Sequence, residues 1–193
     1  MALDALSDVS DEALLVLYAN GDQTAARALN LRLTPRAFGF AARVLSDRSE
    51  AEDVVQEAML RLWRIAPDWR QGEARISTWL YRVVLNLCTD RIRKKRPAAL
   101  EDVPEPEDGA PGALAGLIER DRMQALEAAL ERLPERQRQA VVLRHLEGLG
   151  NPEIAEVMDI GVEAVESLIA RGKRSLTSLL SPRRAELGYD NEV

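Results

Sequence analysis

The sequence predicts an all-α protein, made of two small helical domains that are joined by a flexible acidic linker. Apolar residues recur at three- and four-residue spacing along nearly the whole chain, and no segment shows the alternating pattern of a strand. The exception is residues 97–117, where prolines and acids interrupt that spacing. We therefore place the domains at residues 10–96 and 118–181, the second of which contains a helix-turn-helix.

The N-terminal domain is expected to contain helices at Asp11–Asn20, Gln23–Leu33, Pro35–Leu45, Ser49–Ile65 and Thr78–Lys95. Ser49 and Glu52 have the spacing of a capping box, and Ser77 or Thr78 can cap the last of these helices. The polar segment between the last two helices contains proline and glycine, so we expect a loop that exposes Trp69.

The helix at Ser49–Ile65 has two distinct faces. Its apolar residues form a stripe that can be buried: Val54, Val55, Ala58, Met59, Leu62 and Ile65. The opposite side carries Asp53, Gln56, Glu57 and Arg61. From the residues alone, this second set is either an ordinary solvated face or a surface for a partner.

The helix at Thr78–Lys95 is strongly basic, because arginine and lysine dominate residues 82–96 and Asp90 is the single acid there. Three polar residues at helical spacing share one exposed edge: Arg82, Asn86 and Arg93. Arginine neutralises phosphates and asparagine can hydrogen-bond base edges. Trp69 and Tyr81 are either stacking surfaces for bases or aromatic residues of the core or its rim, and for each one alone the second alternative is favoured. This combination favours single-stranded or melted DNA as the ligand.

The segment at residues 97–117 is too rich in proline and acid to bury a core, and it contains no basic residue. Its prolines and acids are Pro97, Glu101, Asp102, Pro104, Glu105, Pro106, Glu107, Asp108 and Pro111. We expect this segment to be a linker and the tail beyond Ser181 to be frayed.

Two short helices in the C-terminal domain have the layout of a helix-turn-helix. Asn151 can cap a helix that ends near Met158. Asp159 then suits a left-handed position, and Gly161 can cap the second helix. The core residues expected here are Ile154, Ala155, Met158, Val162, Val165, Leu168 and Ile169. The second helix of such a motif enters the major groove of DNA. Basic residues that can hold phosphates follow at its end: Arg171, Lys173 and Arg174. A plain helical hairpin is the alternative.

The formal net charge of −6 argues against a general affinity for nucleic acid, but the basic residues are concentrated near residues 82–96 and 171–174. No apolar run approaches the ~20 residues needed to span a bilayer. The N-terminus has neither a basic flank nor an apolar signal core. The protein is therefore expected in the cytoplasm, without direct insertion into a membrane.

The sequence lacks the groups of residues that catalysis or the binding of a cofactor would need. Cys88 is the single cysteine and lies in an apolar helical pattern, which predicts a packed thiol. His145 is the single histidine and has no second metal ligand nearby, which predicts a packing or surface role. No nucleophile with its base and no glycine-rich phosphate loop is recognisable. We expect a protein that is no enzyme and uses no cofactor or metal.

Four segments follow one another over most of the chain: AEDVVQEAMLRLW (51–63), STWLYRVVLNLCTDRIRKK (77–95), LERLPERQRQAVVLRHLEGLGNPEIAEVM (130–158) and VEAVESLIARGKRSL (162–176). Together they resemble the extracytoplasmic-function (ECF) group of bacterial RNA polymerase sigma factors. The resemblance implies a protein that binds core RNA polymerase, directs it to stress-type promoters and helps to open them.

The resemblance also implies a role for each surface of the N-terminal domain. The matching positions for docking on the clamp helices of the polymerase's largest subunit are Asp53, Gln56, Glu57 and Arg61. The matching positions for the minus-ten promoter element are Trp69, Arg82, Asn86, Asp90, Arg93 and Lys94. The loop Asp68–Ser77 would receive a base flipped from the non-template strand, whose unstacking cost is offset by pocket contacts.

For the rest of the chain, the resemblance implies that the helix-turn-helix reads the minus-thirty-five element as duplex and touches the polymerase flap. The residues placed there are Glu163, Glu166, Ser167, Arg171, Lys173 and Arg174. The acidic linker would thread the polymerase channel. An anti-sigma factor, often membrane-linked in this family, would cover the polymerase-binding surfaces.

The second helix of the motif departs from the family pattern. Glu163 and Glu166 stand where DNA approaches, and Leu168 and Ala170 replace polar positions. A glutamate can accept a hydrogen bond from cytosine N4 or repel phosphates, so the base preference stays open. Gly172, inside the helix, is expected to weaken it by roughly 1 kcal/mol relative to alanine.

Two other classes of function stay open. One is a DNA-binding regulator that never opens the duplex and uses its N-terminal domain for sensing or dimerisation. The other is a helical interaction protein without a role on DNA, such as a decoy that occupies a sigma partner. The basic helix and the loop with Trp69 favour the sigma factor, because a protein that binds only duplex needs neither.

Overall fold

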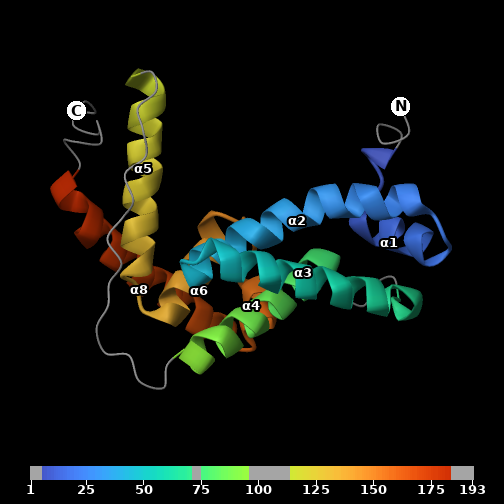
Figure 1. The fold of residues 1–193 in the computed structure, drawn as a ribbon. Coiled ribbons are helices and arrows are strands. Elements are labelled where there is room, and N and C mark those ends of the chain that lie inside the picture. The colour runs from blue at the N-terminus through green and yellow to red at the C-terminus, as the bar shows by residue number, and fades with distance from the viewer. Residues whose placement is uncertain (1–5, 71–74, 96–113, 184–193) are drawn as a thin grey trace.

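The computed structural model describes residues 6–70, 75–95 and 114–183, and within these ranges the chain is helical and contains no strand (Figure 1). The helices are α1 (Asp11–Ala19), α2 (Gln23–Leu45), α3 (Arg48–Ile65), α4 (Ile76–Lys95), α5 (Leu114–Glu131), α6 (Glu135–His145), α7 (Asn151–Met158) and α8 (Val162–Leu180). Two short 3₁₀ turns, η2 (Ala66–Asp68) and η3 (Ser181–Arg183), follow α3 and α8. The predicted all-α class is confirmed.

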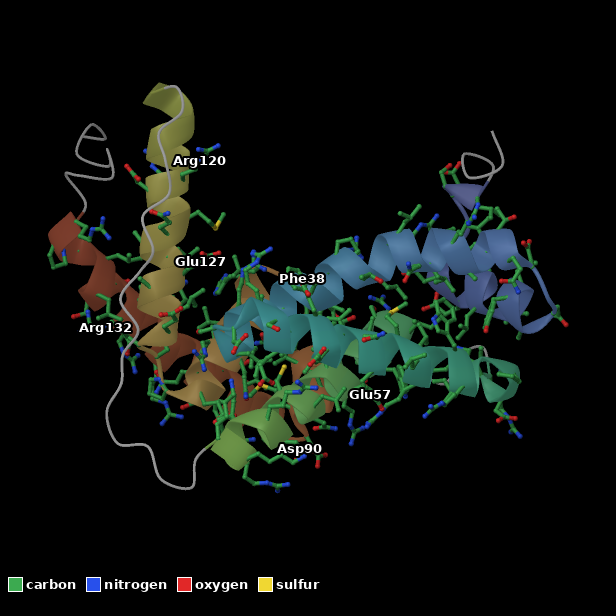
Figure 2. All side chains as sticks on the ribbon, in the orientation of Figure 1. Phe38, Glu57, Asp90, Arg120, Glu127 and Arg132 are labelled. Atoms are coloured by element: carbon green, nitrogen blue, oxygen red, sulfur yellow. The ribbon has the colours of Figure 1, made fainter. Side chains whose placement is uncertain are left out.

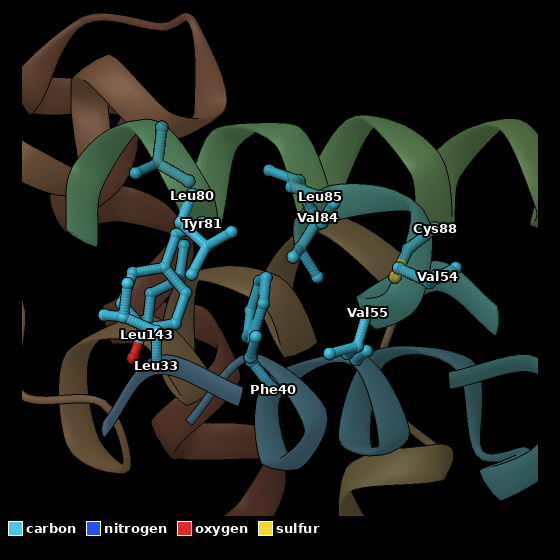
Figure 3. Packing of buried hydrophobic residues seen from close by; sticks show 14 of the residues in the cluster. Leu33, Phe40, Val54, Val55, Leu80, Tyr81, Val84, Leu85, Cys88 and Leu143 are labelled. Carbon is cyan, nitrogen blue, oxygen red and sulfur yellow. The ribbon is translucent and has the colours of Figure 1, made fainter. Parts of the chain in front are cut away.

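The N-terminal and C-terminal helices pack against each other. Contacts join α4 to α7, and α2 to both α5 and α6. The buried apolar side chains form one continuous cluster, and Figure 3 shows Leu143 of α6 in the same cluster as Leu33 of α2 and Tyr81 of α4. The domain boundaries stay a prediction, because most of the 97–117 segment and the tail beyond Arg183 lie outside the described residues.

Helix α2 corrects the expectation of two helices separated before Pro35. Residues Gln23–Leu45 form one helix that contains Pro35 in its interior. Proline lacks the N–H that would donate within the helix, which costs one backbone hydrogen bond. Leu33 and Ala37 on either side of Pro35 are buried in the core, and Pro35 itself is exposed. Burial of the apolar stripe therefore outweighs the lost bond.

The start of α3 is capped by a residue other than the one expected. Asp47 is the N-cap, and its carboxylate accepts a hydrogen bond of 3.0 Å from the backbone N–H of Glu50. The predicted capping box of Ser49 and Glu52 is wrong, since Ser49 already lies inside the helix. A carboxylate two residues earlier in the chain binds a free N–H group at the start of the helix.

The start of α4 is also different from the prediction. The helix begins at Ile76, so neither Ser77 nor Thr78 caps it. The backbone N–H of Ile76 donates to the carboxylate of Glu12, in α1, at 3.2 Å. A residue 64 positions away in the sequence thus satisfies this helix end; local spacing cannot reveal such a cap.

The helix-turn-helix agrees closely with the predicted layout. Helix α7 ends at Met158, Asp159 has a left-handed φ of 53°, and Gly161 is the N-cap of α8. One detail is wrong: Gly150, not Asn151, is the N-cap of α7, and its N–H donates to the Glu153 carboxylate at 2.8 Å. The predicted core residues are buried or half-buried: Ile154, Ala155, Met158, Val162, Val165, Leu168 and Ile169. Val157, which is also buried, was missed.

Gly172 lies where α8 crosses α6 at close range. A Cβ at this position would lie 2.5 Å from Cγ2 of Val141 and 3.3 Å from the carbonyl oxygen of Gln137. Real Cβ atoms do not approach a methyl group this closely without displacing it. The low helix propensity of glycine is therefore accompanied by a packing role that the sequence pattern does not indicate.

Gly172→Ala is expected to lower the free energy of unfolding by about 1–3 kcal/mol, because overpacking outweighs the better helix propensity of alanine. Gly39→Ala in α2 is the matched control, since its Cβ would meet only the flexible end of the Arg43 side chain. Urea unfolding of both variants measures the difference. Equal stability of the two variants, or a more stable Gly172→Ala protein, contradicts the packing role.

Candidate nucleic-acid interface

The outer face of α3 carries the residues predicted to bind core polymerase. Asp53, Gln56 and Arg61 are exposed and Glu57 is half-buried. Nε of Arg61 donates to the Glu57 carboxylate at 2.9 Å, one helical turn away. Figure 2 shows Glu57 on α3 in the part of the molecule away from α5. The structure thus gathers all four predicted side chains on one accessible helix face.

An apolar groove of about 320 Å³ lies beside this face, between α2 and α3. Its apolar lining residues are Phe38, Val55, Met59, Leu60 and Trp63, and Gln56 lies at its border. Leu60 is 45% exposed, although it belongs to the central turns of α3. The sequence analysis did not identify Leu60 as a residue of a possible binding surface. The feature that could have indicated it is a leucine that lies outside the apolar stripe of the helix.

A network of ion pairs joins the beginning of α3 to the end of α4. Arg91 Nη1 lies 2.7 Å from the Glu50 carboxylate and 3.8 Å from that of Asp53. Lys95 Nζ lies 3.2 Å from the Asp47 carboxylate and 3.4 Å from that of Glu50. Part of the basic run at residues 82–96 therefore holds the two helices together and is not a free phosphate-binding surface.

The network shifts the ionisation of its members. The hydrogen bond from Arg91 lowers the pKa of Glu50. The backbone N–H of Glu50 lowers the pKa of Asp47, with Lys95 contributing further. The hydrogen bond to Asp47 raises the pKa of Lys95. Each pKa shift favours the charged form of the group, so the network is stable at pH values at which the carboxylates are ionised.

The predicted exposed edge of α4 is present. The polar side chains predicted there are all exposed: Arg82, Asn86, Asp90, Arg93 and Lys94. Arg93 Nη2 lies 3.0 Å from the Asp90 carboxylate, and Figure 2 shows Asp90 toward the end of α4. Arg82 lies 4.0 Å from the Asp159 carboxylate of the helix-turn-helix. The edge combines basic side chains with an amide, as a nucleic-acid surface requires.

The two aromatic residues considered as stacking surfaces are not freely accessible. Trp69 is half-buried and meets Trp79 edge-on, with ring centroids 6.3 Å apart. Its indole nitrogen is buried and has no hydrogen-bond partner among the described residues. Tyr81 is 5% exposed and packs edge-on against Phe40. Tyr81 is therefore a core residue, the favoured one of the two alternatives that the sequence left open.

The predicted DNA-facing residues of α8 are all exposed: Glu163, Glu166, Ser167, Arg171, Lys173 and Arg174. The first turns of the helix are acidic, and the basic residues lie further along it. Nδ2 of Asn151 donates to the Glu166 carboxylate at 3.4 Å. Helix α7 thus restrains one of the two carboxylates that stand where base edges would approach.

Cys88 and His145 fit the roles expected of them. Cys88 is fully buried in the core, and burial raises the pKa of its thiol to about 12. His145 is exposed at the end of α6 beside an apolar groove, and partial burial lowers its pKa.

Within the described ranges, no three His, Cys, Asp or Glu side chains form a cluster that could hold a metal ion. No helix in those ranges is long and apolar enough to cross a membrane.

Known families and proteins match this chain along most of its length. The family model of Sigma-70 region 2 matches residues 31–98, and that of Sigma-70 region 4 matches residues 123–176. The RNA polymerase sigma-H factor of Pseudomonas aeruginosa is 30% identical over 196 residues, covering 92% of this chain and 97% of that protein. The ECF RNA polymerase sigma factor SigM of Mycobacterium tuberculosis is 35% identical over 175 residues, covering 89% and 85%.

A solved structure shares the fold. The structure of CnrH in complex with the cytosolic domain of CnrY superposes with a TM-score of 0.67 at 26% identity. The similarity covers 89% of this chain and 97% of that chain. The described helices thus have the arrangement of a known two-region fold.

An all-α chain with region 2 near its start and region 4 near its end is a promoter-recognising transcription initiation factor. The chain belongs to the ECF family of RNA polymerase sigma factors. It gives RNA polymerase promoter specificity in a stress-type role and is not itself an enzyme. The choice between a sigma factor and the two alternative classes is thereby decided.

Glu50→Gln is expected to lower the free energy of unfolding at pH 7 by at most about 1 kcal/mol, because it removes the partner of Arg91. Since folding lowers the pKa of Glu50, this stabilisation is present above its ordinary pKa of 4.5 and is lost as the pH falls below it. The difference from the wild type should therefore shrink in urea unfolding at pH 3. Glu52→Gln, which removes an exposed carboxylate from the same helix, is the control for the lost charge.

Proposed function

We propose that this sigma factor divides its contacts among three helices. The outer face of α3 binds core polymerase, the exposed edge of α4 binds the minus-ten element, and α8 reads the minus-thirty-five element. The observation that carries this proposal is the exposed edge of α4, with Arg82, Asn86 and Arg93, inside the stretch that matches Sigma-70 region 2. We further propose domains at residues 10–96 and 118–181, with the acidic linker between them threaded through the polymerase channel.

At the minus-ten element, the α4 edge acts on DNA that has been opened. Asn86 offers both a donor and an acceptor to a base edge, and the flanking arginines neutralise phosphates. The loop Asp68–Ser77, of which residues 71–74 lie outside the described residues, receives an unstacked base, and contacts with that base offset the cost of unstacking. Trp69 packs edge-on against Trp79, so it does not stack freely.

At the minus-thirty-five element, α8 lies in the major groove of closed duplex. Its basic residues hold phosphates whatever the sequence: Arg171, Lys173 and Arg174. Glu163, Glu166 and Ser167 face base edges, and the carboxylates accept hydrogen bonds from cytosine N4. Because a carboxylate repels phosphates, this helix binds only when its register places the acids over bases.

We also propose that the protein acts in the cytoplasm and is held inactive by an anti-sigma partner. Two apolar grooves offer docking sites, one between α2 and α3 and one of about 590 Å³ between α5, α6 and α8. Leu126, Leu130, Leu176 and Leu180 line the second groove. A similar chain, CnrH, has been solved with the cytosolic domain of a second protein, CnrY. A partner that fills both grooves also blocks the α3 face.

Asp53→Ala combined with Gln56→Ala is expected to reduce promoter-dependent transcription about tenfold at limiting sigma concentration, because the α3 face loses contacts to core polymerase. The measurement uses purified core polymerase, this protein and the promoter upstream of its own gene. Asp121→Ala combined with Gln124→Ala is a matched control, since this exposed pair has the same spacing on α5. Equal transcription with both double variants removes α3 from the polymerase interface.

Asn86→Ala is expected to slow promoter opening about tenfold and to leave binding of closed duplex unchanged, because Asn86 meets bases only after melting. Permanganate reactivity of unpaired thymines in the holoenzyme complex measures opening. Gln124→Ala, which removes an exposed amide from α5, is the control. On a promoter whose minus-ten region is already melted, the rate with Asn86→Ala should come closer to the wild-type rate. If the difference between the two rates stays the same there, Asn86 does not act in the opening step.

A further inference from the structure

Asn151 and Glu166 form a contact between the two helices of the helix-turn-helix. Asn151 is the first residue of α7, and Glu166 lies in the second turn of α8. Nδ2 of Asn151 donates to Oε1 of Glu166 at 3.4 Å, although the two residues are 15 positions apart in the sequence. Glu163 is also exposed on α8, but it has no hydrogen bond or ion pair among the described residues. The two glutamates proposed to face bases therefore differ, because only Glu166 is held by a neighbour.

The amide of Asn151 can face this carboxylate in one orientation only. A carboxylate accepts hydrogen bonds and donates none, so Nδ2 must point toward it. If the amide were turned over, Oδ1 would lie against a negatively charged oxygen. Oδ1 points instead into the protein, where it is buried without a hydrogen-bond partner in the described part of the chain. The orientation of the Asn151 amide is thus set by Glu166.

Stability of the fold does not explain this asparagine. A buried acceptor without a partner is unfavourable, so the amide contributes little to folding. Nor does Asn151 cap α7, because Gly150 is the N-cap and its N–H donates to the Glu153 carboxylate at 2.8 Å. The remaining contribution of the Asn151 side chain is a fixed donor beside Glu166.

This donor restrains Glu166 before DNA binds. Val165, the preceding residue, is fully buried, so the backbone of α8 is anchored at this point. Asn151 then holds Oε1, and Oε2 has no hydrogen-bond partner among the described residues. A glutamate without such a partner loses more rotamer freedom when it binds, which weakens the contact. Glu166 therefore presents one oxygen in a preferred direction.

A single carboxylate oxygen distinguishes the four bases by their donors. In the major groove, cytosine presents the N4 amino group, whereas guanine and thymine present acceptors. Adenine has an amino group at N6, but the acceptor N7 lies beside it and opposes a carboxylate. Oε2 of Glu166 is therefore suited to cytosine.

We propose that Asn151 is a positioning residue that orients Glu166 toward a cytosine of the minus-thirty-five element. The base preference at one position of that element is then set by α7 and α8 together, and Asn151 needs no contact with DNA. This inference rests on the proposed function of α8 in reading the minus-thirty-five element.

The same geometry predicts what an amide at position 166 reads. In Glu166→Gln, Nδ2 of Asn151 still requires an acceptor and therefore holds the amide oxygen of the new side chain. The amide nitrogen then points toward the base, so a donor replaces an acceptor. The preference at this position is expected to move from cytosine to guanine, which presents two acceptors at its edge. A glutamine without this restraint would favour adenine, which it can bind through both ends of its amide.

The test selects promoters that are bound by holoenzyme from a library randomised only in the minus-thirty-five element. Sequencing before and after selection gives the enrichment of each base at each position. Ratios between bases exclude any change in affinity that applies to all sequences. The variants are Asn151→Ala, Glu166→Ala and their combination. Glu163→Ala, with and without Asn151→Ala, is the matched control, because Glu163 is an exposed glutamate of the same helix.

Asn151→Ala is expected to lower the cytosine preference about threefold at the position where Glu166→Ala removes it. It should change no further ratio when Glu166→Ala is already present, and it should leave any preference that depends on Glu163 unchanged. A cytosine preference that survives Asn151→Ala overturns the proposal. An effect of Asn151→Ala that persists without Glu166 overturns it as well, since that effect would be structural. A move of Glu166→Gln to adenine overturns the orientation.

Asn151→Asp is a second variant, which decides the question if Asn151→Ala does not fold. It keeps the size of the side chain, and an acid is favourable in the first turn of a helix. It places a like charge beside Glu166, so the cytosine preference should fall at least as far as in Asn151→Ala. An unchanged preference in folded Asn151→Asp again overturns the proposal.

The selection separates failure of this inference from failure of the proposed function. If neither Glu163→Ala nor Glu166→Ala changes any ratio, the proposed reading of bases by α8 fails, and the role of Asn151 fails with it. If either glutamate variant changes a ratio while Asn151→Ala changes none, α8 reads the element and only the positioning role of Asn151 is overturned.

Discussion

The burial of one side of α4 is the constraint on which the rest of the structure depends. Ile76, Leu80, Val84 and Cys88 lie in the core, and α4 contacts α2, α3 and α7 at once. Because the helix is packed on several sides, its polar residues can emerge only along a narrow edge. The same packing that stabilises the fold therefore decides which side chains are available to DNA, and a stiff, buried helix holds them in fixed relative positions.

The basic run on α4 serves two purposes that composition alone cannot separate. Arg91 and Lys95 face the acids at the start of α3 and lock the two helices together. Asn86 and Lys94 face outward. The helical period distributes these residues around the helix axis. Some basic residues of one segment therefore hold the helices together, while others are exposed to solvent. Coupling α3 to α4 in this way also links the polymerase-facing helix to the helix that faces promoter DNA.

Sequence patterns predicted well what local chemistry determines, and less well what depends on distant contacts. The helical class and the turn at Asp159 and Gly161 follow from spacing and backbone preference within a few residues. The continuity of α2 through Pro35, the capping of α4 by Glu12 and the burial of Tyr81 all depend on neighbours far away in the sequence. In each of these cases tertiary packing overrides the local signal.

Two acids of the helix-turn-helix, Glu153 and Asp159, lie beside arginines of the N-terminal domain, so their charge is partly compensated within the chain. A net charge of −6 weakens the general affinity of the protein for DNA, and these acids add to it. Free sigma factor would otherwise be sequestered on nonspecific DNA, because a genome presents far more of it than of promoters. A weak general affinity for DNA therefore leaves more of the protein available to core polymerase.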